Sequence, residues 1–407
     1  MFAARNRPFW VCMLLLLGVY LPTSSGGEIT KGWTQFALMV VCLLLSILLV
    51  SERGRAKGDL LFIGSFILLL LLVFTPFSLL PIPVYGVLAS FAVFSLLISI
   101  RFENIRATRL VERTFIFVNI ANIFLGCGIL FHLHPVQWLI ENYYSAAYPE
   151  LVPMMLDNGK PVLTYATHSL AGLVHYLFFW VNLCAYKQTG RRIHLWFSAV
   201  YLIFMLSLLS VSGLVFFGAA LAQLMWTFMR GKTLMAALSV SFLTLALFAT
   251  AKFLGNQGYF SEGIASEARD VVSSEGNGFL GRYSYAGNLL PVLDYLSEHP
   301  LRPAGLKTDD DWLLIDSGPI GYYVRGSIVL LVLMYRGFFL FLKRNLLNRR
   351  NAYFLFAVVV CFEVGFSALT SFRVVCILPI MIVYLNGLRV AYPKKMPSQQ
   401  VLAVGNV

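Results

Sequence analysis

The residues best suited to chemistry in this 407-residue chain are concentrated in one stretch, from about Leu254 to Pro319. Ten of the nineteen acidic residues of the protein lie there, and cationic side chains accompany them. The cationic and imidazole side chains of the stretch are Arg269, Arg282, Arg302, Lys307 and His299. Carboxylates and imidazoles exchange protons with substrates, and arginine or lysine neutralises anionic groups. This concentration favours an enzyme, because transport proteins generally place their polar groups inside the bundle.

The elements that must position this stretch are expected to be membrane helices. Apolar residues make up 59% of the chain and charged residues only 12%, with a mean hydropathy of +0.77. That composition leaves too little polar surface for a water-soluble globule, and it excludes a disordered chain, a coiled coil and collagen. The six cysteines show no CxxC or Cys/His spacing, so we expect neither a disulfide framework nor a zinc site.

About twelve apolar runs approach the roughly 20 residues that a helix needs to cross a membrane. They are approximately Phe9–Leu21, Trp33–Val50, Leu60–Leu80, Val84–Ile100, Thr114–Leu133, Thr164–Tyr186, Ile193–Leu209, Val211–Met229, Leu234–Phe253, Ile320–Leu342, Ala352–Leu369 and Val374–Leu388. The block from Ile193 to Met229 is divided at Ser207–Gly213, since it is too long for one span. A single span there would give eleven helices and invert everything after it. The predicted fold class is all-α, a polytopic membrane protein.

The positions of the basic residues favour twelve spans with both termini in the cytoplasm. Lys and Arg collect in the cytoplasmic loops of membrane proteins, and 21 of the 31 basic residues fall in the loops and tails assigned to that side. The first run follows Arg5 and Arg7 but lacks a small-x-small cleavage site, so we expect a retained helix and not a signal peptide. Basic residues dispersed in this way do not form a nucleic-acid footprint.

This topology divides the chain into four parts. Residues 1–253 hold spans one to nine, 254–319 form one large exterior loop, 320–388 hold spans ten to twelve, and 389–407 are a cytoplasmic tail.

Both exterior segments are expected to carry recognisable features. In the large loop, Tyr283–Glu298 is predicted to be a helix with a bend at Pro291, and His299-Pro300 ends it. A shorter exterior segment, from about His134 to Leu163, carries aromatic side chains that suit either stacking on sugars or anchoring at the membrane surface. They are Trp138, Tyr143, Tyr144 and Tyr148.

Two segments resemble a known family. In the large loop, Arg282-Tyr283 and the predicted helix are followed by His299-Pro300-Leu301-Arg302-Pro303-Ala304-Gly305-Leu306, by Asp309-Asp310-Asp311, and by Asp316-Ser317-Gly318-Pro319-Ile320-Gly321. The mid-chain segment is Lys160-Pro161-Val162-Leu163-Thr164-Tyr165-Ala166-Thr167-His168-Ser169-Leu170-Ala171. With many spans and a late large loop, this order resembles the O-antigen polymerase (Wzy) and O-antigen ligase superfamily of the bacterial inner membrane. The resemblance implies a periplasmic loop on a helical bundle akin to the GT-C class of membrane glycosyltransferases.

Two departures from the family pattern bear on which branch the chain resembles. The mid-chain hairpin reads Ser210-Val211-Ser212-Gly213, where the family often has Thr-x-Ser-Arg. The acidic run Asp309–Asp311 stands where the ligase branch tends to have a histidine. The second departure favours the polymerase branch.

The resemblance implies transfer of a glycan from undecaprenyl pyrophosphate to a sugar hydroxyl, with no nucleotide sugar, cofactor or metal. A polymerase would join lipid-linked oligosaccharide repeat units of O-antigen, in lipopolysaccharide biosynthesis, or of a capsule or exopolysaccharide. The expected partners are the undecaprenyl-pyrophosphate-linked glycan and membrane lipid, with no nucleic acid. The resemblance also allows a chain-length-regulating membrane protein as a partner.

This chemistry suggests roles for individual residues. The leaving pyrophosphate needs cations as its charge grows, and the acceptor hydroxyl gains from a nearby base. The base candidates are Asp311 and Asp310, followed by His299. The candidates for binding pyrophosphate or sugar are Arg282, Arg302, Arg325, Arg373, Lys160 and His168. Structural roles stand beside these, namely salt bridges and solvated turns in the loop and a snorkelling interfacial side chain for Arg373.

Two other functions remain open at this point. An O-antigen ligase would perform the same chemistry with lipid A-core as the acceptor. A glycan or lipid-linked-oligosaccharide transporter would draw on Glu363, a carboxylate deep in the predicted span Ala352–Leu369. His168 and His175, seven residues apart on one helix face, suit polar packing, acceptor binding or a proton relay.

Overall fold

The structure is a computed structural model of the chain. It describes residues 7–21, 37, 40–41, 44, 58–75, 82–102, 108–145, 149–165, 167–228, 289–306, 315, 317–346 and 348–392.

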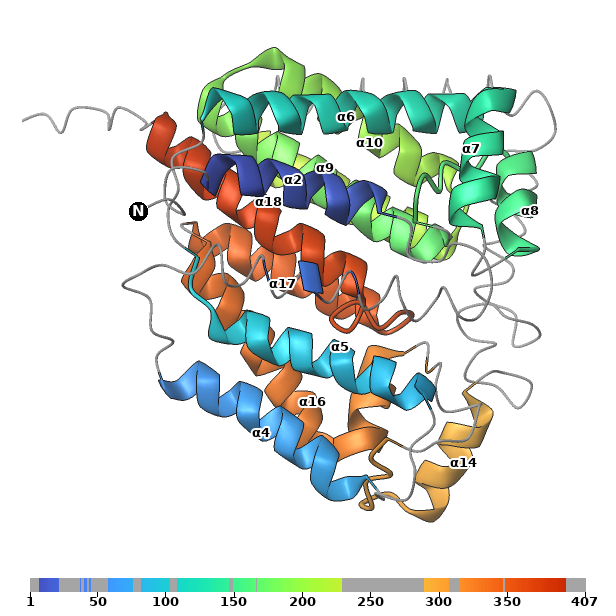
Figure 1. Cartoon of the computed structure of the whole chain (residues 1–407), viewed down its shortest axis with the longest axis vertical. Helices are drawn as coiled ribbons and strands as arrows, with labels where there is room; N and C mark the ends of the chain where they lie inside the picture. The colour runs from blue at the N-terminus through green and yellow to red at the C-terminus, as the bar shows by residue number, and fades with distance from the viewer. Residues whose placement is uncertain are drawn as a thin grey trace, which may run out of the picture.

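Within those residues the regular structure is entirely helical (Figure 1). In chain order the helices are α2 (Arg7–Tyr20), α4 (Gly58–Phe74), α5 (Ile82–Ser99), α6 (Arg109–Leu130), α7 (His134–Tyr144), α8 (Leu151–Asp157), α9 (His168–Thr189), α10 (Arg192–Ser207), α11 (Val211–Phe228), α14 (Leu290–Glu298), α16 (Gly318–Asn345), α17 (Arg349–Glu363) and α18 (Phe372–Ala391).

Four of the described helices, α6, α9, α16 and α18, are long and apolar enough to cross a membrane. Shorter apolar helices lie beside them, in the regions of α2, α4, α5, α10 and α11. Length and composition together indicate a membrane protein, as predicted.

Ten of the twelve predicted runs coincide with a described helix. The other two, Trp33–Val50 and Leu234–Phe253, lie outside the described residues apart from positions 37, 40, 41 and 44. The total of twelve spans therefore stays a prediction. The division of the long apolar block is confirmed, because α10 ends at Ser207 and α11 begins at Val211.

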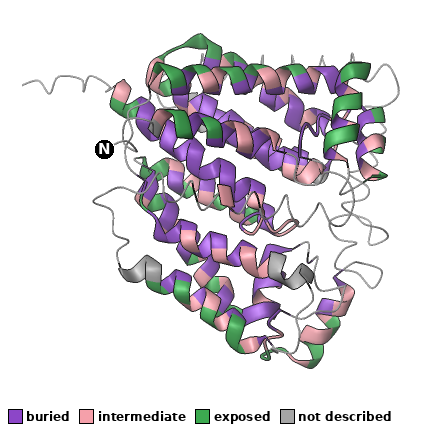
Figure 2. Cartoon of the chain, in the orientation of Figure 1, coloured by how far each residue is buried: buried purple, intermediate pink, exposed green. Residues whose placement is uncertain are grey.

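The core of the larger helix group is built around α9 and α18 (Figure 2). Both helices are buried along most of their length, with α2, α6, α10 and α11 packed around them. Aromatic rings fill the centre, where Phe115 stacks on Tyr384 at 4.2 Å and Phe178 stacks on Tyr201 at 5.3 Å. Such rings supply much buried apolar area for each ordered side chain.

A second group is formed by α4, α5 and α16, which pack on one another. Gly64 of α4 lies against the backbone of Ser95 in α5, and Gly337 of α16 lies against Ile98 of α5. Side chains larger than hydrogen at these glycines would push the helices apart, so small residues permit the close approach. Helix α17 joins the two groups, because it contacts both α16 and α11.

At one end of the bundle, polar side chains connect the ends of neighbouring helices. The Asn345 amide accepts from Phe102 N–H at 2.8 Å and donates to Ile100 O at 3.1 Å, and Asn386 donates to Asn345 O at 2.6 Å. Close by in the larger group, Arg191 pairs with Glu112 at 2.8 Å. These are the ends of α5, α6, α9, α16 and α18 that the sequence predicts to share the cytoplasmic side.

The opposite set of helix ends carries the predicted exterior segments. Helices α7, α8 and α14 all lie at that end, on the right of Figure 1. The exterior segment His134–Leu163 contains α7 and α8, two short helices that the sequence reading did not anticipate.

Several helix boundaries differ from prediction, and three of them bear on the candidate site. Helix α14 begins at Leu290, so Pro291 lies in its first turn and not at an internal bend, while Tyr283–Asn288 lie outside the described residues. Proline is favoured in a first turn because no N–H is needed there. Helix α9 begins at His168, where Thr167 caps it. Helix α17 ends at Glu363, six residues earlier than predicted.

Helix α16 is interrupted near its first third. Gly326 has φ −148° and ψ 22°, and Ser327 has φ 63° and ψ −172°, so neither residue is helical. The helix therefore consists of a first segment, 318–325, and a second segment, 328–345.

Candidate functional site

The predicted site residues divide between described and undescribed parts of the chain. Asp310, Asp311 and Arg282 lie outside the described residues. The structure places the other six, at or beside helix ends that the sequence predicts to face the exterior: His299, Arg302, Arg325, Arg373, Lys160 and His168.

The loop that carries the family resemblance binds directly to the interruption in α16. Ala304 donates its N–H to Val324 O at 2.7 Å, and Gly305 donates to Arg325 O at 3.2 Å. These two carbonyls are available because the interruption ends the helical hydrogen bonding of the first segment. On the other side of the loop, Leu306 N–H donates to the Thr75 hydroxyl at 3.0 Å. Residues 304–306 thus connect α16 to the end of α4.

Gly305 is the residue that this connection depends on most closely. Its φ is +63°, in the left-handed region, and a Cβ at this position would collide with the carbonyl oxygen of Phe74. Glycine meets both requirements, since it tolerates positive φ and has no side chain.

His299 and Arg302 mark the two ends of the turn before that loop. His299 ends α14, where its N–H donates to Tyr295 O at 2.8 Å and its ring lies 5.1 Å from the Tyr295 ring. Arg302 is exposed, and its carbonyl accepts from the Tyr295 hydroxyl at 3.1 Å. The Arg302 side chain is therefore accessible to a ligand, while His299 is half-buried.

Arg325 is buried at the interruption in α16, with 8% of its surface exposed. Its guanidinium lies over the Phe91 ring at 6.0 Å, and Phe91 meets Tyr322 edge to face at 5.9 Å. The position of this arginine, directly before two non-helical residues and beside the loop 304–306, makes it the cation most closely built into the site.

Arg373 is also buried, with 2% of its surface exposed. The guanidinium donates to Val19 O at 2.7 Å, to Gly18 O at 3.1 Å and to Thr164 O at 3.3 Å. It also lies over the Tyr165 ring at 5.6 Å. Arg373 therefore joins the end of α2 and the loop before α9 to the start of α18. It does not snorkel to the membrane surface, which was the structural role that the sequence suggested for it.

Tyrosines beside Arg373 extend this polar cluster. The Tyr144 hydroxyl donates to Tyr20 O at 2.6 Å, and the Tyr20 hydroxyl donates to the Asn122 side chain at 3.0 Å. Burial raises the pKa of Tyr165 and of Tyr144, and the Arg373 guanidinium opposes both shifts. Both phenols therefore remain protonated at neutral pH. Of the other aromatic side chains of this segment, Trp138 and Tyr143 are exposed, and Tyr148 lies outside the described residues.

Lys160 and His168 lie close to the starts of α9 and α11. Lys160 is half-buried and its Nζ donates to Leu209 O at 3.4 Å, while His168 is the first residue of α9. Hydroxyl groups connect the two helix starts, with Ser212 Oγ 3.5 Å from Ser169 Oγ and 3.3 Å from Ser210 Oγ. By contrast, His175 is fully buried and its Nε2 contacts Pro161 O at 2.8 Å, which is polar packing.

Glu363 is a residue that the site prediction omitted, although the sequence marked it as an isolated carboxylate in an apolar run. It is the last residue of α17 and fully buried, so it lies at a helix end and not midway along a longer span. Its Oε1 accepts from the Tyr322 hydroxyl at 2.8 Å and from Leu369 N–H at 2.7 Å. These contacts connect α17 to α16, the helix that contains Arg325.

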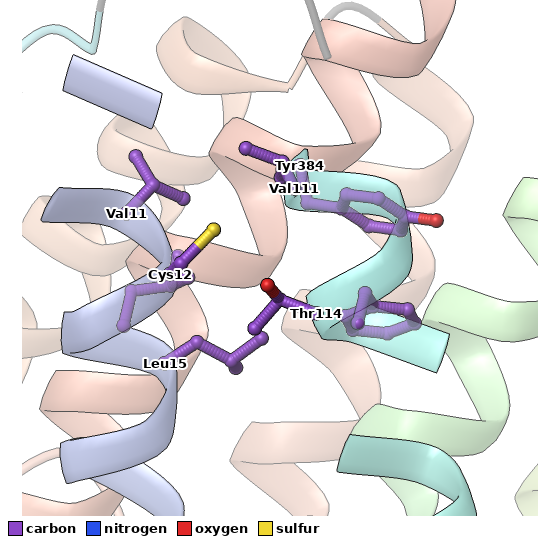
Figure 3. Close-up of a pocket in the computed structure, with 8 residues that line it drawn as sticks. Val11, Cys12, Leu15, Val111, Thr114 and Tyr384 are labelled. Carbon is purple, nitrogen blue, oxygen red and sulfur yellow. The ribbon is translucent and has the colours of Figure 1, made fainter. Parts of the chain in front are cut away.

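A small apolar cavity lies elsewhere, between α2, α6 and α18 (Figure 3). Its lining includes Cys12, Thr114 and Tyr384, and its volume is about 10 Å³. That volume is at the lower limit for one water molecule, so this cavity is no site for a glycan. The described residues also contain no group of three His, Cys, Asp or Glu side chains that could hold a metal ion.

Comparison of the chain with protein-family models, with curated proteins and with solved structures finds no match.

Proposed function

We propose that this protein is a membrane glycosyltransferase of the bacterial inner membrane. It polymerises undecaprenyl-pyrophosphate-linked oligosaccharide repeat units at the periplasmic face. The substrate-binding cations are Arg325, Arg302 and Lys160, and the bases are Asp310 and Asp311 of the large loop. The proposal extends the sequence resemblance to the O-antigen polymerase branch.

One observation carries the proposal. The loop segment that resembles the family pattern donates hydrogen bonds from Ala304 and Gly305 to carbonyls at the interruption in α16. That interruption directly follows Arg325, whose guanidinium is suited to a pyrophosphate leaving group. An exposed arginine, Arg302, lies two residues before Ala304. Backbone hydrogen bonds thus join the loop that follows Arg302 to the helix segment that ends at Arg325.

The mid-chain segment adds support from a distant part of the sequence. Lys160 and the hydroxyls of Ser169 and Ser212 lie beside the starts of α9 and α11. Helix starts carry a partial positive charge and favour anions. This arrangement suits a phosphate or a polar sugar, as expected for a substrate that has both.

A substitution of Arg325 tests the proposal in cells that carry the gene. For Arg325→Ala we expect roughly 100-fold slower polymerisation, the scale of losing one charge-stabilising group. A gel of surface glycans should then lose its long ladder and retain a single repeat unit. Arg336→Ala is the matched control, because Arg336 lies on the same helix and is exposed. Immunoblots of the membrane fraction establish that both variants are present.

Other gel patterns would support other functions. Free polymer together with bare lipid A-core would indicate the ligase. An unchanged pattern in every surface polymer, including in a deletion strain, would contradict glycosyl transfer. The transporter alternative then gains weight from the interrupted helix α16 and the buried Glu363, since interrupted helices and buried carboxylates are features of transport sites.

A further inference from the structure

The interruption in α16 folds this helix back sharply. The rings of Tyr322 and Tyr335 lie 6.0 Å apart, although 13 residues separate them. In a continuous α-helix, residues at that separation would be about 20 Å apart along the axis. The first and second segments of α16 must therefore form an angle that brings the two tyrosines together.

The carboxylate of Glu363 lies between these two tyrosines. Its Oε1 accepts a hydrogen bond from Tyr322 of the first segment, at 2.8 Å. The Tyr335 hydroxyl, from the second segment, is close enough to interact with the same carboxylate electrostatically. The Tyr335 hydroxyl and Glu363 Oε2 are both buried, and neither atom forms a hydrogen bond within the described residues. A small movement would thus allow Tyr335 to donate to Oε2.

Two further contacts fix where the carboxylate lies. Leu369 N–H donates to Oε1 at 2.7 Å, which ties the turn before α18 to the same group. A methyl group at Gly318 would lie 2.7 Å from Oε2, so the absence of a side chain there leaves room for the carboxylate. Gly318 begins α16, and a helix start favours a negative charge.

A fully buried carboxylate is costly unless the protein compensates for it. The position of Glu363 also affects Arg325. Tyr322, which binds the carboxylate, lies one turn before Arg325, and the interruption of α16 directly follows Arg325. A change in the angle between the first and second segments of α16 therefore moves the Arg325 guanidinium.

We propose that Glu363 is a positioning residue that holds the two segments of α16 at the angle which presents Arg325 to the substrate. The carboxylate acts through Tyr322 and Tyr335, one from each segment, and it does not touch the reacting atoms. The inference rests on the proposed function only in taking Arg325 as the residue that binds the anionic group.

Hydrogen–deuterium exchange of the purified full-length protein in lipid nanodiscs tests the mechanical part without any substrate. For Glu363→Ala we expect about tenfold faster exchange of the amides at 326–330, the scale of losing one buried hydrogen bond. Tyr322→Phe, which removes the hydroxyl group that donates to Oε1, should accelerate exchange in the same region. Glu363→Gln should restore most of the protection, because its amide oxygen can still accept from Tyr322 and Leu369. Tyr353→Phe is the control, since Tyr353 lies on α17 with 52% of its surface exposed.

Glycan polymer made in cells tests the connection to Arg325. Polymer should fall about tenfold in Glu363→Ala, and the double variant with Arg325→Ala should be no worse than Arg325→Ala alone. Unchanged exchange in a folded Glu363→Ala protein would overturn the proposal, as would additive losses in the double variant. If Glu363→Ala does not fold, unchanged exchange in Tyr322→Phe has the same force. If Arg325→Ala leaves all glycans intact, the proposed function fails separately, while the exchange rates still decide whether Glu363 holds the angle.

Discussion

Arg373 shows how this protein buries a positive charge. In the described structure its guanidinium uses backbone carbonyls at the end of α2 and in the loop before α9 as acceptors. The last carbonyls of a helix have no partner within the helix, so the arginine satisfies groups that would otherwise need water. The fork of N–H donors in arginine can reach several acceptors at once.

We expect Arg373→Ala to lower the stability of the folded protein by about 2–3 kcal/mol, because hydrogen bonds to a charged donor are lost and buried carbonyls remain unpaired. The measurement is the midpoint of thermal unfolding in detergent. Arg389→Ala provides the comparison, since Arg389 is an exposed arginine on the same helix. Equal midpoints for the two variants would show that the Arg373 contacts contribute nothing to stability.

At the scale of elements, the connection between the loop 304–306 and α16 depends on Gly305. Two effects oppose an alanine there, the positive φ and the collision with Phe74 O. Gly190 allows the first effect to be measured without the second. Its φ is +72°, but no heavy atom lies within 4 Å of a Cβ added there.

Gly305→Ala should therefore detach the loop, whereas Gly190→Ala should cost only the backbone strain of about 1 kcal/mol. Exchange of the amide hydrogens of residues 304–306 reports the detachment. We expect faster exchange at these amides in Gly305→Ala and no change there in Gly190→Ala. Protected amides in Gly305→Ala would mean that the loop is held mainly by other contacts, such as that of Tyr323 with Pro300.

The elements differ in how far the sequence predicts them. Long apolar runs identify helices such as α6 and α18 reliably, because a span is a local signal that needs no tertiary information. The interruption at Gly326–Ser327 was not predicted, since glycine and serine occur in many continuous membrane helices. Burial of Arg373 was likewise not predictable, because its acceptors lie more than 200 residues away in the sequence.

In the candidate site, too, the local features were predictable from the sequence and the tertiary contacts were not. The sequence singled out Arg325 by its charge in an apolar run, and the structure adds that it lies at an interruption that the loop 304–306 completes. In the sequence, Glu363 counted only in favour of a transporter, because a carboxylate in an apolar run does not reveal its partners. Its contacts with Tyr322 and Leu369 depend on tertiary packing.

At the scale of the whole molecule, the helix ends form two sets at opposite ends of the bundle. One set is joined by Asn345 and by the Arg191–Glu112 pair, and the other carries α7, α8 and α14 (Figure 1). These are the two sets that the distribution of Lys and Arg assigns to opposite sides of the membrane.

Labelling of single cysteines with a membrane-impermeant maleimide tests this assignment. In a protein with its native cysteines replaced, Leu301→Cys should react in intact spheroplasts, because Leu301 is 86% exposed at the α14 end. Lys343→Cys, exposed near the end of α16, should react only after the membrane is opened. The reverse pattern, or reaction of both sites in intact cells, would contradict the predicted orientation.

The grouping of α4 and α5 with α16 has a consequence for biosynthesis. The ribosome completes the α4–α5 hairpin more than 200 residues before it makes α16, whose Gly337 lies against Ile63 of α4 and Ile98 of α5. Contacts between such distant segments form slowly, since the intervening chain must first be ordered. During synthesis the hairpin must therefore wait in the lipid with one face uncovered. The last helices made complete both groups, so a nascent chain stopped before residue 318 lacks the contacts of α17 with α16 and α11 and those of α18 with α5.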